Sequence, residues 1–91
     1  MTVQVHIPPV LRSVTGGNRN LEAEGSTIAE VLRDLARNYP PLALHLFDEN
    51  GSARRNVLCI HGMRAVRPRD FDSHAVNPGD EIILTNALAG G

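Results

Sequence analysis

The chain has 91 residues, of which 42% are hydrophobic and only three are aromatic, and its ten acidic and nine basic residues give a formal net charge of -1. This length predicts a single domain, residues 1–91, around one small aliphatic core. All nine basic residues are arginines, scattered with acids among them, so we expect no basic stripe for nucleic acid. Five of them are close enough in sequence to gather in space: Arg54, Arg55, Arg64, Arg67 and Arg69. Without lysine, no side-chain amine is available for acylation.

The N-terminal sequence MTVQVHIPP has neither the charged leader nor the apolar segment of a signal peptide. No stretch of the chain reaches the length of a membrane span. We therefore expect a cytoplasmic protein that makes no contact with a membrane.

Cysteine and histidine give little sign of a catalytic or metal site. Cys59 is the only cysteine, which excludes an internal disulfide and a zinc site of several thiolates. It lies in the apolar run NVLCIHG, where a buried strand residue is favoured over a reactive thiol. The histidines lie in different expected elements, without metal-binding spacing or an acid in a recognised motif: His6, His45, His61 and His74. The sequence predicts no metal site.

The N-terminal half of the chain predicts two strands and a helix. Alternation of apolar and polar residues indicates strands at 2–7 and 19–24, the first closed by Pro8 and Pro9. A helix follows over 27–39, with Glu30 in capping-box register to Thr27 and apolar residues repeating at helical spacing.

The C-terminal half predicts three more strands. The pair Pro40 and Pro41 stops the helix, and a short helical turn follows within 42–47. The nearly continuous apolar run 57–60 indicates a strand over 56–61, covered on both faces or partly covered by a partner. A short return strand at 65–66 and a turn at 77–80 lead to the last strand, 81–85.

This order of elements predicts the α+β class, with one mixed sheet and one main helix laid across one of its faces. If the first and last strands are parallel neighbours at the sheet centre, the fold is the ubiquitin-like beta-grasp. The pattern alone does not fix that pairing.

The end of the chain carries the strongest indication of function. A flexible tail of about residues 86–91 follows the last strand, and it ends in Gly90 and Gly91. Glycines can enter a channel too narrow for a Cβ, and from Thr85 the tail reaches up to roughly 20 Å. The reactive group would be the α-carboxylate of Gly91. A partner would activate it with AMP from ATP, after which a sulfur donor gives a thiocarboxylate and an amine gives an amide.

Two motifs carry a family resemblance. The pattern NPGDEIIL followed by ALAGG resembles the end of the ubiquitin-like sulfur carriers of the ThiS and MoaD kind. The stretch HIPPVLRSVTGG is similar to the CysO branch, which delivers sulfur for cysteine synthesis in actinobacteria. The resemblance implies a beta-grasp fold and, as partners, an E1-like adenylating sulfurtransferase, a pyridoxal-phosphate cysteine synthase and a metalloprotease. The sequence departs from the wider family at Asn86, where a proline or an aromatic residue is common.

The resemblance also implies roles for individual residues. Gly91 would bear the thiocarboxylate, Gly90 would allow passage, and Ala87, Leu88 and Ala89 would form the apolar part of the tail that docks in the partner. The sheet face opposite the helix would be the docking surface. It would include the following residues: Val57 or Cys59, Ile60, Ile83, and Arg64 or Arg67.

The leading hypothesis is a sulfur carrier, a protein co-substrate that binds no cofactor itself, with ATP used by its partner. Cysteine is the favoured destination of the sulfur, followed by molybdopterin, thiamin or a thio-sugar made by a thio-sugar synthase. Two other classes stay open. One is a ubiquitin-like modifier conjugated through Gly91, and the other is a non-catalytic small subunit or interaction module.

Overall fold

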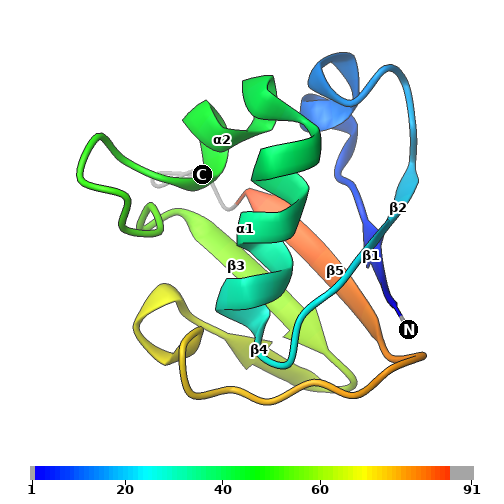
Figure 1. The fold of residues 1–91 in the computed structure, drawn as a ribbon, viewed down its shortest axis with the longest axis vertical. Coiled ribbons are helices and arrows are strands. Elements are labelled where there is room, and N and C mark those ends of the chain that lie inside the picture. The colour runs from blue at the N-terminus through cyan, green and yellow to red at the C-terminus, as the bar shows by residue number, and fades with distance from the viewer. Residues whose placement is uncertain (1, 87–91) are drawn as a thin grey trace.

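The computed structural model describes residues 2–86, which form one sheet with helices packed against it (Figure 1). The strands and α-helices are β1 (Val3–His6), β2 (Asn20–Ala23), α1 (Ile28–Asn38), α2 (Pro40–Leu46), β3 (Val57–His61), β4 (Arg64–Val66) and β5 (Glu81–Asn86). Short 3₁₀ helices cover Pro9–Val14 and Pro68–Asp70. Within these described residues, no helix combines the length and the apolarity needed to cross a bilayer.

The five strands lie in the order β2-β1-β5-β3-β4. The first and last strands are parallel neighbours, with Val5 opposite Ile82, whereas every other pairing is antiparallel. Strand β5 therefore occupies the centre of the sheet, between β1 and β3. The beta-grasp fold is confirmed.

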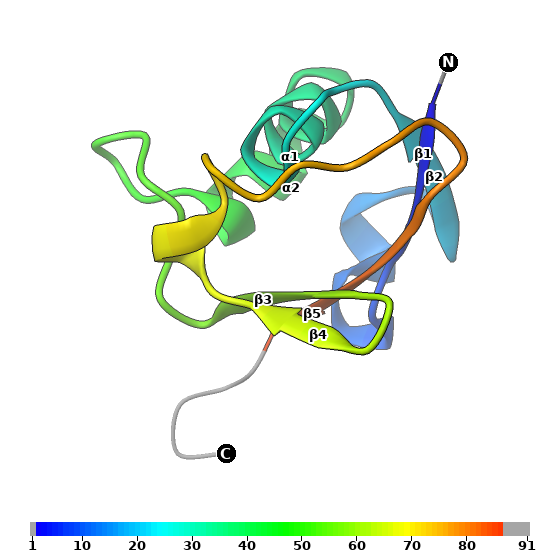
Figure 2. The same cartoon turned by 90° about the horizontal axis from the view of Figure 1, so that it is seen from below.

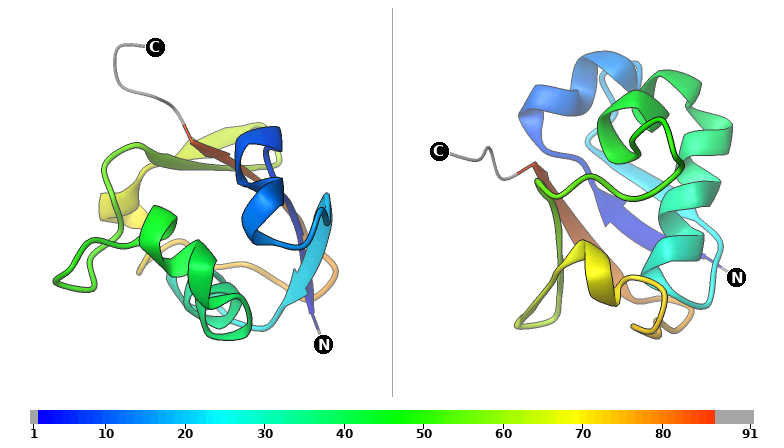
Figure 3. Two further views of the ribbon diagram at one scale, coloured as in Figure 1. Left: turned by 90° about the horizontal axis from the view of Figure 1, so that it is seen from above. Right: turned by 90° about the vertical axis from the view of Figure 1, so that its left-hand side faces the viewer.

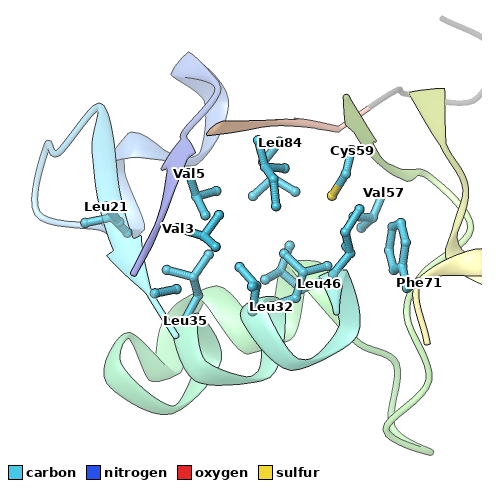
Figure 4. Packing of buried hydrophobic residues seen from close by; sticks show 14 of the residues in the cluster. Val3, Val5, Leu21, Leu32, Leu35, Leu46, Val57, Cys59, Phe71 and Leu84 are labelled. Atoms are coloured by element: carbon cyan, nitrogen blue, oxygen red, sulfur yellow. The ribbon is translucent and has the colours of Figure 1, made fainter. Parts of the chain in front are cut away.

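Both α-helices lie on the same side of the sheet, and no α-helix within residues 2–86 covers the opposite face (Figures 2 and 3). We call the uncovered side the outer face. Strand residues alternate between the two sides, as the period of a strand requires. Val3, Val5 and Leu84 point into the core, where they meet Leu32 and Leu35 of α1 (Figure 4). The core is aliphatic except for Cys59 and the ring of Phe71.

The predicted start of α1 is confirmed in detail. The Thr27 hydroxyl accepts a hydrogen bond from the Glu30 amide at 3.2 Å, and the Glu30 carboxylate accepts one from the Ser26 amide at 2.8 Å. The first two amides of the helix, of Ile28 and Ala29, donate to carbonyls of the β4–β5 connection, those of His74 and Phe71. These contacts satisfy donors that a helix start leaves free, and they fasten the connection beneath α1.

Local structure differs from the expectations at four places. The predicted stop of the main helix is confirmed, since α1 ends at Asn38 and Tyr39 leaves the helical region with φ -131° and ψ 76°. The prolines themselves stand in the first turn of α2, where a missing N–H costs nothing, so the second helix begins before the expected residue 42. Pro9 likewise opens a 3₁₀ helix that alternation does not reveal. Among the described residues β3 is covered on one face only, since Leu58 and Ile60 are half-buried on the outer face. Coverage on both faces is therefore wrong, and coverage by a partner stays a prediction. Finally, β5 continues to Asn86, so that residue belongs to the sheet rather than to the tail.

Candidate functional site

The outer face has an apolar centre made by strands β3 and β5. Ile60 of β3 lies directly opposite Ile83 of β5, and Ile83 also pairs with His6 of β1 on its other side. Ile83 is 46% exposed, which is unusual for a large aliphatic side chain in a central strand. The two predicted isoleucines are thus brought together as a cross-strand pair on the uncovered face.

The outer face of the neighbouring strands is polar. Gln4 of β1 donates from its side-chain amide to the Glu22 carboxylate of β2 at 3.1 Å, and the Thr2 hydroxyl donates to the same carboxylate at 3.4 Å. His6 pairs with Glu81 at 2.8 Å between Nε2 and Oε1. The apolar surface is therefore confined to β3 and β5 and is bordered by hydrogen-bonded polar side chains.

A shallow depression of about 430 Å³ lies beside the isoleucine pair, at the end of the sheet where β5 begins. Its lining combines the two isoleucines with charged and titratable side chains and two glycines: His6, Ile60, His61, Gly62, Gly79, Asp80, Glu81 and Ile83.

A histidine cluster, His61 with His74 and Asp80, stands next to this depression. His61 Nε2 lies 2.9 Å from Asp80 Oδ2, and His61 Nδ1 lies 2.9 Å from His74 Nε2. The same Asp80 oxygen accepts the backbone amide of Asn77 at 2.9 Å. Because a carboxylate only accepts hydrogen bonds, His61 donates from Nε2. When both rings are neutral, His74 then donates from Nε2 to His61 Nδ1.

The environment of the cluster favours a neutral His74 and an ionised Asp80. Desolvation, followed by the fields of His61 and Arg64, lowers the pKa of His74 below its ordinary value. The Asn77 amide, followed by the hydrogen bond from His61, lowers the pKa of Asp80. The cluster thus links β3, the β4–β5 connection and the turn before β5 through hydrogen bonds to the ionised Asp80 and between the two imidazole rings.

Sequence reasoning missed this cluster and the pair of His6 with Glu81. His61 and His74 are 13 residues apart, and His61 and Asp80 are 19 apart. No spacing rule brings such positions together, because only the pairing of β5 between β1 and β3 does so. Among the described residues, no group of three or more histidine, cysteine, aspartate or glutamate side chains could hold a metal ion.

The structure separates the two arginines that the sequence assigns to docking. Arg64 pairs with His61 in the β3–β4 ladder, so it stands on the helix side of the sheet and lines a depression with Asp70 and His74. Arg67 follows β4 in extended conformation, with φ -94° and ψ 160°, and is exposed. Since Val66 points into the core, alternation turns Arg67 toward the outer face.

Val57 and Cys59 do not belong to the outer face, so that expectation is wrong. They occupy the inward positions of β3 and are 2% and 0% exposed. The buried-strand interpretation of Cys59 is confirmed, and burial raises the pKa of its thiol to about 12. A thiol in this state is a poor nucleophile.

The predicted tail residues lie outside the described residues: Ala87, Leu88, Ala89, Gly90 and Gly91. Their roles stay predictions. The last described position, Asn86, pairs with Val57, so the chain runs directly from the central strand into the tail sequence.

Comparison with known proteins relates the chain to one family over almost its whole length. A model of the ThiS family matches residues 5–91. The sulfur carrier protein CysO of Mycobacterium tuberculosis strain H37Rv is 34% identical over 93 residues, covering 100% of both chains. A crystal structure of the Amycolatopsis orientalis BexX/CysO complex contains a chain that is 30% identical, with a TM-score of 0.82 over 98% of this chain and 99% of that chain.

A more distant structural neighbour shares the fold alone. SAMP1 of Haloferax volcanii superposes with a TM-score of 0.82 over 100% of both chains, at 20% sequence identity.

Proposed function

The chain belongs to the ThiS family, and from this membership we propose that it is a sulfur carrier protein whose Gly91 carboxylate is converted to a thiocarboxylate. The observation that carries the proposal is the full-length match to a sulfur carrier, 34% identical with both chains covered completely. The fold supports it, because the central strand β5 leads into the sequence ALAGG.

The proposed chemistry begins on a partner enzyme. An oxygen of the Gly91 carboxylate attacks the α-phosphorus of ATP, pyrophosphate leaves, and an acyl-adenylate forms. A sulfur nucleophile then attacks the carbonyl carbon and AMP departs, which leaves sulfur on the last residue. ATP is bound by the partner, so the carrier needs no cofactor of its own. Because activation consumes ATP, we place the reaction in the cytoplasm.

In this role the chain is a co-substrate, and its residues dock rather than catalyse. Ile60 and Ile83 give the outer face an apolar contact area, and no α-helix within residues 2–86 overlies it, which leaves it open to a partner. Leu88 with Ala87 and Ala89 would enter the partner, and Gly90 would pass its narrowest point. Cys59 takes no part, because it is buried and its pKa is about 12.

Cysteine is the product that we propose for the carried sulfur. The support comes from the relatives. The Mycobacterium tuberculosis protein matched over its full length is named CysO, and the Amycolatopsis complex contains a protein of the same name. The proposed partners are then an E1-like adenylating sulfurtransferase, a pyridoxal-phosphate cysteine synthase and a metalloprotease that frees the cysteine. That a CysO chain has been crystallised with BexX supports the view that proteins of this kind act through complexes.

Intact mass spectrometry tests the proposal. The full chain is incubated with ATP, sulfide and the adenylating enzyme of the same organism, and its mass is compared with that of a variant lacking Gly91. A gain equal to replacement of one oxygen by sulfur, absent from the truncated variant, is the expected result. An amide-linked adduct with a second protein would instead identify a modifier. Tight binding that survives loss of Gly91, without any mass change, would identify an interaction module.

A further inference from the structure

Charge is segregated along the C-terminal half of the chain. Residues 50–69 contain no acid and five arginines: Arg54, Arg55, Arg64, Arg67 and Arg69. Residues 70–86 contain no lysine or arginine and four acids: Asp70, Asp72, Asp80 and Glu81. The first stretch includes β3 and β4 and the second ends with β5, so the basic residues gather around the β3–β4 hairpin and the acidic residues in the connection that leads into β5.

Two of these arginines lie near the place where β5 ends. The turn that carries Arg55 closes with a hydrogen bond from the Val57 amide to the Arg54 carbonyl at 3.1 Å, and Val57 pairs with Asn86, the last residue of β5. Arg67 lies one residue beyond Val66, which pairs with Cys59 in β3. The antiparallel register therefore puts Arg55 and Arg67 at the same end of the β3–β4 hairpin, which is the end at which β5 finishes.

Both side chains are exposed, and neither forms an ion pair with any other residue in the described part of the chain. Other arginines are engaged: Arg33 pairs with Asp72, Arg37 with Asp34, and Arg54 donates to the Leu44 carbonyl. Arg55 and Arg67 thus offer two exposed positive charges to a partner, at the end of the β3–β4 hairpin where β5 finishes.

We propose that Arg55 and Arg67 recognise an acidic rim around the opening through which an adenylating partner receives the tail. Guanidinium groups pair with carboxylates in bidentate geometry, which fixes direction as well as proximity. Docking of the isoleucine pair alone leaves the carrier free to rotate about the contact. A second, charged contact beside the end of β5 sets the direction in which the chain leaves the sheet. The occupant is a protein surface carrying aspartate or glutamate.

This inference rests on the proposed function, because it assumes that the partner takes up the tail. Charges at the rim of an interface act mainly on the association rate and its salt dependence. The step to follow is therefore formation of the acyl-adenylate, measured by exchange of pyrophosphate into ATP with the organism's own adenylating enzyme, as the concentration of carrier is varied at two ionic strengths.

The test variant is the double charge reversal Arg55→Glu with Arg67→Glu. The matched control is the double charge reversal Arg19→Glu with Arg37→Glu, which gives the same net charge. Arg19 lies immediately before β2 and Arg37 lies in α1, so neither belongs to the β3–β4 hairpin. We expect the KM for the test variant to rise about tenfold at low salt, with kcat little changed, and the difference to shrink at high salt. The control should stay within about twofold of the wild-type chain, and circular dichroism should show both variants folded.

The outcomes separate the two proposals. A wild-type chain that is adenylated with the same KM as the test variant overturns the acidic-rim inference and leaves the carrier function standing. Equal losses in the test and control variants also overturn it, because net charge alone would then explain them. A wild-type chain that no adenylating enzyme of the organism accepts overturns the carrier function and this inference together.

Discussion

Replacing Cys59 by serine probes whether the only thiol of the chain serves packing or chemistry. Cys59 is 0% exposed on the inward face of β3, opposite Leu84 of β5 and Val66 of β4 (Figure 4). A serine hydroxyl would meet apolar side chains and a backbone ladder whose groups are already paired. Burying a hydrogen-bonding group without a partner costs about 1–3 kcal/mol.

Taking about 2 kcal/mol for the loss, the unfolding temperature should fall by roughly 8–16 °C, since 1 kcal/mol shifts a domain of this size by about 4–8 °C. Thermal unfolding followed by circular dichroism measures this shift. Cys59→Ala is the matched control, because it removes the sulfur without adding a polar group. The serine variant should melt below the alanine variant. Below its melting point, each variant should still accept sulfur on its last residue.

Two results would refute the reasoning. If the serine and alanine variants melt together, the hydroxyl finds a partner and the surroundings of Cys59 are not as dry as the packing indicates. If either variant stays folded and yet takes up no sulfur from ATP, sulfide and the adenylating enzyme, the thiol takes part in the chemistry.

Three further predictions follow from features of the fold and the outer face. The lowered pKa of His74 contributes stability that is present above pH 6.5, its unfolded value, and is lost as the pH falls through the lowered pKa. The urea midpoint should therefore drop on acidification, and a His74→Gln variant that drops equally would contradict this. Thr27→Ala should cost about 1 kcal/mol in urea unfolding by removing the α1 cap, while Thr27→Ser, which keeps a hydroxyl, costs less. Ile83→Asp should weaken binding to the adenylating partner, measured by calorimetry, while the circular dichroism spectrum stays that of a folded protein, since Ile83 is 46% exposed. An unchanged affinity would show that the outer face takes no part in docking.

The regular elements could be predicted because their signals are local. Thr27 and Glu30 marked the start of α1, and the alternation of Val3 and Val5 marked the buried face of β1. The apolar run of β3 left open whether its second face meets the core or a partner, because residues facing a partner surface are as apolar as residues facing a core. Within residues 2–86 no α-helix lies over the outer face of β3, and that arrangement is a property of the whole fold.

The candidate site could be predicted only in part, because its contacts depend on how distant segments pair. The family resemblance implied that Ile60 and Ile83 share one face, but their direct opposition depends on the register between β3 and β5. The contacts of His61 with His74 and Asp80 depend on the same register and on the path of the β4–β5 connection. Long-range pairing of this kind leaves no trace in sequence spacing.

The central place of β5 also has a consequence for how the protein is made. Synthesis runs from the N-terminus, so β1–β2 and β3–β4 emerge first as two hairpins that share no direct pairing. Only β5 joins them, and its pairing of Gln4 with Glu81 closes a very long loop, which makes folding slow to complete. A nascent chain that stops short of β5 has no continuous sheet. The complete outer face therefore exists only once β5 has been synthesised and paired, so an incomplete chain cannot present it to a partner.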